Sequence, residues 1–213
     1  MNSTGTPLMP GRRSLLLSAA GLLLCQPRSA QAGAQVEEPL ADAVRSALAA
    51  SVANSAPPRP RFDQIDERLA YLRWLGAMSE KLKKRKSEAQ IRIEFLETLW
   101  YEAKRAGLEP SLVLGLVQVE SGFRKYAISI AGARGYMQVM PFWAKLIGDG
   151  QASRLFHMQT NLRFGCVILR HYLDREQGDL YLALGRYNGS RGRPEYPRAV
   201  FAARKQWLMP GEV

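Results

Sequence analysis

From residue 62 onward, apolar residues recur at every third or fourth position along most of the chain, which is the spacing of amphipathic helices. The first such segment ends in the basic cluster at 81–86. We expect this cluster to be the solvated end of a helix, because cations are favoured near a helix C-terminus. The expected buried face consists of Ile65, Leu69, Leu72 and either Leu75 or Gly76.

The same spacing continues to the end of the chain, and local signals mark several helix ends. Pro110 suits the first turn of a helix, while Gly107 and Gly122 suit left-handed terminators. No segment shows the sustained alternation that is typical of a strand. The sequence therefore predicts an all-α or mostly α fold. The expected helices cover residues 88–106, 110–121, 141–147, 160–176, 180–187 and 197–207.

Residues 1–32 have the organisation of a secretory signal peptide. Arg12 and Arg13 precede the apolar stretch 14–24, and residues 30–32 (Ala-Gln-Ala) offer the small side chains that a signal peptidase accepts. The apolar stretch is too short to be a permanent membrane anchor. We therefore expect an exported, periplasmic or cell-envelope protein whose mature chain begins at Gly33.

The route and fate of this segment stay open. The arginine pair fits both the twin-arginine pathway and general secretion, and a transit peptide is an alternative because acidic residues are absent. Cys25 raises the possibility of lipidation, against which Leu24 argues because a small residue is expected there.

After the signal segment, the chain divides into three parts by composition. Residues 33–60 form an Ala/Pro-rich linker with a weak helix around 40–52. Residues 61–87 form an N-terminal helical extension, and residues 88–213 form the main domain.

The formal net charge of +11 falls to +8 once the three arginines of residues 1–32 are removed. Such a basic chain suits anionic polymers, namely nucleic acid, phospholipid headgroups or carboxylate-bearing peptidoglycan, and the signal segment argues against nucleic acid. Cys166 would be the sole cysteine of the mature chain, which excludes an intramolecular disulfide there. Its apolar context predicts a buried, inert thiol rather than a nucleophile working with His157 or His171.

Glu120 interrupts an apolar stripe. Helical spacing places it in line with Leu112, Val113, Leu116 and Val117. Apolar surroundings and the nearby carbonyl end of the helix both raise the pKa of a carboxyl group, and a protonated carboxyl is what a general acid for glycosidic cleavage requires. The alternative is a partly exposed glutamate at a frayed helix end.

Four motifs, in order, resemble the soluble lytic transglycosylase family of lysozyme-like enzymes. They are ESGF at 120–123, SIAGARGYMQVMP at 129–141, YNG at 187–189 and the segment 196–200, which begins Tyr-Pro. The resemblance extends over about residues 88–205.

The resemblance implies a goose-lysozyme-type helical domain with a saccharide groove. Such a domain cleaves the β-1,4 bond between N-acetylmuramic acid and N-acetylglucosamine in peptidoglycan glycan strands and leaves 1,6-anhydromuramic ends. The family's catalytic glutamate maps onto Glu120, and neither cofactor nor metal is implied. An envelope or secretion-machine partner is possible, whereas nucleic acid and a membrane span after signal cleavage are not expected.

The resemblance also assigns subsite residues. Ser129 looks like a hydroxyl that contacts the sugar, Gln138 and Met140 like groove-wall residues, and Tyr187 like the phenol that points toward the glutamate. Asn188 is either a groove residue or a polar turn former. Ser129 could instead bond backbone groups, and Met140 could be plain core.

The loop that carries these residues contains Gly132 and Gly135, which we expect to let the backbone approach a ligand closely. Tyr136 and Ile130 depart from the family's more frequent residues, as does the pair Arg124-Lys125, which predicts a more basic groove rim.

Alternatives to this function remain. A conventional glycosidase needs two carboxylates, and the matched motifs supply one. A hydrolytic muramidase on the same fold would use Asp149 or Asp174 to guide water. A non-catalytic glycan-binding protein would need neither.

Overall fold

The computed structural model describes residues 1, 60–147 and 151–211. The predicted signal segment beyond Met1, the predicted helix at 40–52, the linker before Pro60 and Asp149 lie outside the described residues.

The described part of the chain is helical. It contains no named strand, and its β-bridges are isolated pairs that join Arg134 to Ile128 and to Val139. The predicted all-α class is thus confirmed over the described ranges. In order, the elements are α2 (Ile65–Leu82), α3 (Ala89–Arg105), α4 (Pro110–Ser121), α5 (Pro141–Ile147), the 3-10 helix η1 (Ala152–Phe156), α6 (Met158–Arg175), α7 (Leu180–Asn188) and α8 (Glu195–Lys205).

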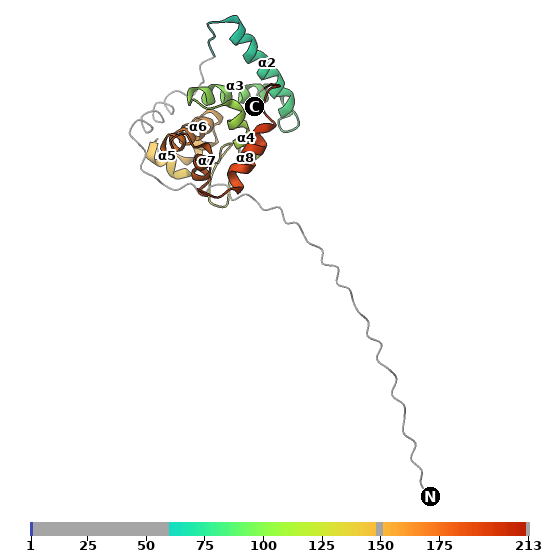
Figure 1. Ribbon diagram of the computed structural model, residues 1–213, viewed down its shortest axis with the longest axis vertical. Helices are drawn as coiled ribbons and strands as arrows, with labels where there is room; N and C mark the ends of the chain where they lie inside the picture. The colour runs from blue at the N-terminus through green and yellow to red at the C-terminus, as the bar shows by residue number, and fades with distance from the viewer. Residues whose placement is uncertain (2–59, 148–150, 212–213) are drawn as a thin grey trace.

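Figure 1 shows helices α3 to α8 gathered into one group, with α2 leaning against α3 at its upper edge. The most extensive helix contact joins α4 to α8, while α6 packs on both α3 and α7. The sequence did not predict η1, which is too short to show a helical period.

Helix ends follow the signals in the sequence. α4 has Pro110 in its first turn, where a missing N–H costs nothing, and ends at Gly122, whose φ of 57° is left-handed. After α3, Gly107 adopts a φ of 66° and ends that helix in the same way. Both predicted terminators are confirmed, and Gly122 places Glu120 in the last turn of α4.

α4 is buried on nearly all sides. The five stripe residues are all buried, and so are Ser111, Leu114 and Gly115. At Gly115, an added Cβ would lie 2.7 Å from the Arg204 backbone nitrogen, so α8 approaches α4 more closely than any side chain would allow.

The predicted buried face of α2 is wrong at three of its four positions, and only Leu75, one of the two residues given for the fourth, is buried. Ile65, Leu69 and Leu72 are 78%, 45% and 48% exposed, and Gly76 is exposed as well. The apolar residues that α2 buries in the core it shares with α3 are Tyr71, Trp74, Leu75, Met78 and Leu82. Two sets of apolar residues with helical spacing alternate along α2, and the set with the larger, aromatic side chains lies at the contact with α3.

The basic cluster at 81–86 is only partly solvated. Lys83, Lys84 and Arg85 are exposed, but Lys86 is half-buried and donates from Nζ to the Tyr136 hydroxyl at 2.9 Å. Its Nζ also lies 5.2 Å from the centre of the Phe95 ring. Burial, together with the charge of Lys125, lowers the pKa of Lys86. Lys86, the last residue of this cluster, is thus partly buried by its contacts with aromatic side chains.

Candidate active site

Glu120 is the buried carboxyl group around which the candidate site is built. Its side chain is 7% exposed at the end of α4, where it completes the predicted stripe. Oε1 accepts a hydrogen bond from the Tyr196 hydroxyl, while Oε2 is buried with no hydrogen-bond partner among the described residues. One oxygen is therefore held in place and the other is free.

Burial raises the pKa of Glu120 to about 8, and the hydrogen bond from Tyr196 opposes part of that rise. The direction agrees with the sequence prediction. Near neutral pH the carboxyl group is mainly protonated, so it has a proton to donate.

Tyr196 is the phenol that contacts Glu120, which corrects the prediction made for Tyr187. Tyr187 is fully buried and its hydroxyl donates to the Met137 carbonyl at 2.8 Å. Tyr196 lies in the first turn of α8, 76 positions beyond Glu120, and packing of α8 on α4 brings the two together. The Tyr-Pro motif at 196–197 was the available signal, but the motif alone did not reveal its partner.

Ser129 closes the loop between α4 and α5. Its backbone N–H donates to the Ala133 carbonyl at 3.0 Å, and its Oγ accepts from the Ala133 N–H, also at 3.0 Å. The backbone-bonding alternative for Ser129 is therefore confirmed, although the side chain is also half-exposed.

Gln138 braces the same loop from inside. It is 2% exposed, and its Nε2 donates to the carbonyls of Gly135 at 2.9 Å and Ala127 at 3.2 Å. Its φ of 48° is unusual for a residue with a side chain. These bonds account for a conformation that would otherwise be costly.

Two further side chains, Asn161 and Ser121, fix this loop, and neither role was predicted from the sequence. Asn161 on α6 is fully buried, donates to the carbonyls of Arg134 and Leu155 at 2.8 Å each, and accepts from the Met137 N–H at 2.8 Å. Ser121 Oγ, next to Glu120, donates to the Tyr136 carbonyl at 2.7 Å. No local sequence pattern predicts this role of Asn161, because its hydrogen-bond partners lie up to 27 positions away.

The close approach that Gly135 permits is to the protein itself. A Cβ there would lie 2.4 Å from Asn161 Nδ2, and its φ of 75° is left-handed. Gly132, with a φ of 85°, faces open space instead. The expectation of close ligand approach therefore does not hold for Gly135.

The remaining predicted subsite residues are Met140 and Asn188. Met140 follows the loop directly and is half-buried against the core. Asn188 is 7% exposed at the last position of α7, before Gly189 with its φ of 79°.

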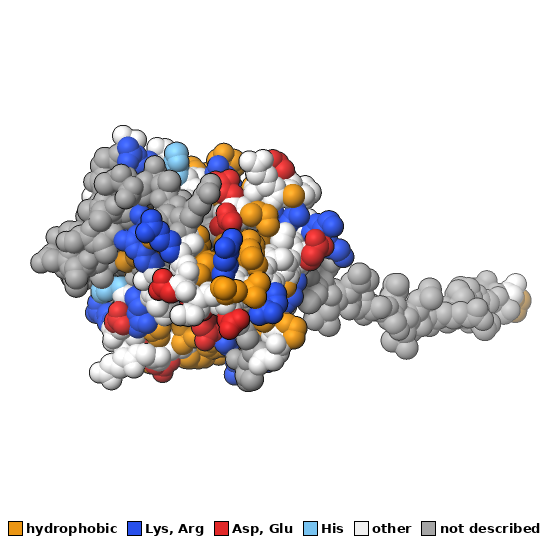
Figure 2. Space-filling view, turned by 90° about the horizontal axis from the view of Figure 1, so that it is seen from above, with side chains coloured by type: hydrophobic (Ala, Val, Ile, Leu, Met, Phe, Trp, Pro, Cys, Tyr) orange, Lys and Arg blue, Asp and Glu red, His pale blue; other side chains and the backbone are white. Residues whose placement is uncertain are grey.

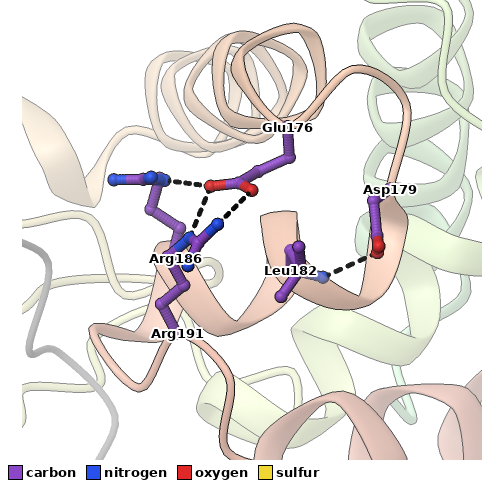
Figure 3. A network of polar contacts seen from close by, with 5 residues as sticks. All are labelled: Glu176, Asp179, Leu182, Arg186 and Arg191. Carbon is purple, nitrogen blue, oxygen red and sulfur yellow. Dashed lines mark hydrogen bonds and ion pairs between the residues drawn. The ribbon is translucent and has the colours of Figure 1, made fainter.

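A cluster of charges anchors the connection from α7 to α8 (Figure 3). Glu176 accepts from Arg186 Nε at 2.6 Å and, with both oxygens, from Arg191 at 2.8 and 2.9 Å. Hydrogen bonds from Arg191 are the main reason that the pKa of Glu176 is lowered to about 2. Asp179 caps α7 by accepting from the Leu182 N–H at 2.9 Å. These contacts hold the segment that joins Tyr187 to Tyr196.

The described ranges contain few other residues that are candidates for catalysis or metal binding. Asp174 has a side chain that is 66% exposed and pairs with Arg170 on α6. Cys166 is fully buried, as predicted, and burial raises the pKa of its thiol well above the usual value. Among residues 60–147 and 151–211, no three His, Cys, Asp or Glu side chains gather as a metal would require. None of the helices in these ranges combines the length and apolar character that crossing a membrane requires.

Known proteins resemble part of this chain. Membrane-bound lytic murein transglycosylase C of Actinobacillus pleuropneumoniae serotype 5b is 37% identical over 114 residues, which cover 46% of this chain and 31% of that protein. The transglycosylase of Enterobacteria phage PRD1 is 35% identical over 104 residues, which cover 49% of this chain and 38% of the phage protein. The chain thus spans about a third of the length of these curated relatives.

Among solved structures, an inactive mutant of the lytic transglycosylase Slt from Pseudomonas aeruginosa aligns with a TM-score of 0.43 and 25% identity. The alignment covers 66% of this chain and 27% of that one. The family model of the transglycosylase SLT domain matches residues 98–209, which is more than half of the 213 residues and includes Glu120, the loop and Tyr196. The chain therefore belongs to the transglycosylase SLT domain family.

Proposed function

We propose that this protein is a peptidoglycan lytic transglycosylase. It cleaves the β-1,4 bond between N-acetylmuramic acid and N-acetylglucosamine and forms 1,6-anhydromuramic ends. The observation that carries the proposal is the state of Glu120: a buried carboxyl group with a pKa of about 8, set within the matched family region.

Glu120 performs both proton transfers in this reaction. Its carboxyl group first protonates the oxygen that leaves as the C–O bond to the muramic acid breaks, and the N-acetyl carbonyl stabilises the anomeric carbon. The carboxylate then removes the proton from the 6-hydroxyl as that oxygen bonds to the anomeric carbon, so the enzyme regains its starting state. A single carboxyl group is sufficient.

The two oxygens of Glu120 have different roles in this scheme. Tyr196 holds Oε1 and stabilises the carboxylate that forms when the proton leaves. Oε2 has no described partner, so we assign the transferred proton to that atom. Tyr196 thereby positions the acid and eases its ionisation.

The other family residues divide by exposure. We assign glycan contact to Ser129 and Met140, which are half-exposed around the loop. Gln138 and Tyr187 are buried and bonded to backbone carbonyls, so we assign them the positioning of that loop. Asn188 retains the groove assignment implied by the family resemblance.

A hydrolytic muramidase would need a second carboxylate to activate water. Asp174 fits this role poorly, because it is exposed and already paired with Arg170. Asp149, the other carboxylate considered for this role, lies outside the described residues.

We also infer that the protein acts in the cell envelope, exported by residues 1–32. The match to a relative named as membrane-bound supports an envelope location. Immunoblotting of periplasmic and cytoplasmic fractions tests it: full-length precursor confined to the cytoplasm would contradict export.

Glu120→Gln tests the proposed function, because the amide preserves shape and the hydrogen bond from Tyr196 but donates no acidic proton. We expect at least a thousandfold loss of muropeptide release from purified sacculi with the fold retained. Glu97→Gln, on the exposed face of α3, is the matched control and should release muropeptides normally. Mass spectrometry of the products decides the reaction type, since anhydro-muropeptides are one water molecule lighter than hydrolysed ones.

A further inference from the structure

A cleft of about 1010 Å³ lies away from Glu120, between α2, α3 and the end of α8. Ser111, in the first turn of α4, lines it. The rise of an α-helix puts this residue roughly 14 Å along the helix axis from Glu120. Neither Glu120 nor Tyr196 lines the cleft, so it is a separate site.

Aromatic rings from α2, α3 and the segment before α2 line the cleft. Tyr71 packs against Trp100 with ring centres 4.8 Å apart and against Phe62 at 5.1 Å, and Trp74 lies beside Tyr71 at 6.3 Å. All four of these residues line the cleft. Phe62 and Trp100 are half-buried and offer apolar ring surface to a ligand, whereas Tyr71 and Trp74 are buried in the core.

The aromatic wall also carries a polar hydrogen without a partner among the described residues. Tyr71 is 7% exposed, and its hydroxyl is buried with no hydrogen-bond partner in the described part of the chain. Burial raises the pKa of Tyr71 to about 12, so the hydroxyl stays a donor at neutral pH. An unsatisfied buried hydroxyl costs stability, which is accounted for if a ligand accepts its hydrogen bond.

Positive charge surrounds these rings. Arg61, Arg73 and Lys104 line the cleft, and within residues 60–147 and 151–211 none of them has an ion-pair partner. Two carboxylates also line it: Glu67, and Glu109, which is paired at 2.6 Å with Arg204, a fourth cation of the lining. Figure 2, which looks onto the side where α2 lies, shows hydrophobic side chains interspersed with both basic and acidic ones. The cleft therefore combines aromatic faces with excess positive charge.

We propose that this cleft is a second saccharide-binding site, which takes a carboxylate-bearing glycan. Aromatic rings pack against the apolar faces of pyranose rings, the Tyr71 hydroxyl donates to a sugar oxygen, and the three cations receive the carboxylate. The volume is enough for several sugar units.

The identification of this glycan as peptidoglycan rests on the proposed function. Muramic acid carries a lactyl carboxylate, which a neutral N-acetylglucosamine polymer lacks. A strand held in the cleft would keep the enzyme on its polymeric substrate while the Glu120 site acts on another stretch.

Calorimetric titration of the full-length Glu120→Gln protein tests the cleft without cleavage. The probe is a peptide-free tetrasaccharide of alternating N-acetylglucosamine and N-acetylmuramic acid, and chitotetraose is the neutral comparison. We expect two binding events per chain with the acidic probe. In Arg73→Ala/Lys104→Ala, one event should weaken at least tenfold, as expected for lost hydrogen bonds to a charged group. Chitotetraose should bind the cleft at least tenfold more weakly than the acidic probe.

Arg68→Ala/Arg105→Ala is the matched control, because it removes the same charge from exposed positions on the same two helices, away from the cleft. It should bind like the parent. A single binding event in the parent, or equal binding by the two double variants, overturns the cleft proposal. That result is distinguishable from failure of the proposed function, which would appear as missing anhydro products while the cleft variant still loses its binding event.

Tyr71→Phe separates ligand binding from folding. The ring contacts remain while the unpartnered hydroxyl is removed, so the melting temperature without saccharide should be unchanged or higher. Affinity for the acidic tetrasaccharide should fall severalfold. A lower melting temperature with unchanged affinity would assign the hydroxyl a structural role and overturn this part of the proposal.

Discussion

At the scale of single residues, the proton affinity of Glu120 is set by burial and by one neutral hydrogen bond. Burial disfavours the carboxylate, while the Tyr196 hydroxyl favours it, and burial is the larger effect. The group is thereby kept protonated near neutrality without being locked in that state. A general acid that must also act as a base needs this balance.

This balance predicts an alkaline limit to activity. Glu120 must be protonated to start the reaction, so the rate should fall as pH rises through about 8, the pKa of the group. Tyr196→Phe removes the hydrogen bond that lowers this pKa, so the alkaline limb should move to higher pH. The maximal rate should fall about tenfold to a hundredfold, because the carboxylate loses a hydrogen bond. Initial rates of solubilisation of sacculi between pH 5 and 10 measure both effects.

Tyr187→Phe is the control for that profile. Its hydroxyl donates to the Met137 carbonyl, so removing it should lower thermal stability while leaving the alkaline limb where it was. A limb that moved with Tyr187→Phe and stayed fixed with Tyr196→Phe would restore the original assignment of the phenol to Tyr187.

At the scale of elements, the contact between α4 and α8 builds the site. α4 carries Glu120 and α8 carries Tyr196, so the spacing of the two helices sets the hydrogen bond between them. Gly115 makes this spacing possible, since α8 backbone occupies the place of its missing side chain. The position demands glycine because of packing, although glycine weakens a helix.

Gly115→Ala and Gly76→Ala should therefore have opposite effects. At Gly115 the new Cβ would meet backbone atoms of Arg204 and Val200 within 3.0 Å, and we expect a loss of about 1–3 kcal/mol in the free energy of unfolding. At Gly76 on α2 nothing lies within 4 Å, and we expect a gain of about 0.5–1 kcal/mol. Urea denaturation followed by circular dichroism measures both. Equal effects at the two positions would mean that helix propensity, not the α4–α8 contact, controls stability here.

Sequence predicted helices well because their signals are local. Gly107, Pro110 and Gly122 act on their own backbone, and apolar spacing is counted within one segment. It failed for the face of α2, where the set containing Ile65 and the set containing Tyr71 have equally helical spacing. The choice between such sets depends on the surface that α3 presents, which no pattern within α2 records.

In the site, too, features set within one helix could be predicted and contacts between distant segments could not. Glu120 was identifiable because the apolar stripe lies within one helix. Tyr196, which bonds to Glu120, and Asn161, which bonds to the loop, could not be identified in this way. Their contacts join one helix to a segment far along the chain. Family motifs marked which segments matter, but only packing determined which side chains meet.

At the scale of the whole molecule, one buried ion pair joins α3 to α6 across the domain. Glu102 and Arg163 have side chains that are 1% and 4% exposed, and Arg163 Nε lies 2.9 Å from both carboxylate oxygens. α6 also carries Asn161, which holds the active-site loop. The placement of α6 against α3 therefore bears on the site.

Breaking this pair from one side should cost far more than removing both partners. In Arg163→Met, the Glu102 carboxylate is left buried without its cation, and we expect a loss of about 3–5 kcal/mol in the free energy of unfolding. Glu102→Met/Arg163→Met leaves no buried charge, so it should regain most of that loss even though it removes more polar contacts. Arg170→Met, which breaks an exposed pair on the same helix, should cost at most about 1 kcal/mol. Urea titrations of the three variants measure these differences. If the double variant were as unstable as Arg163→Met, the pair itself, rather than the avoidance of an isolated charge, would be what holds α3 and α6 together.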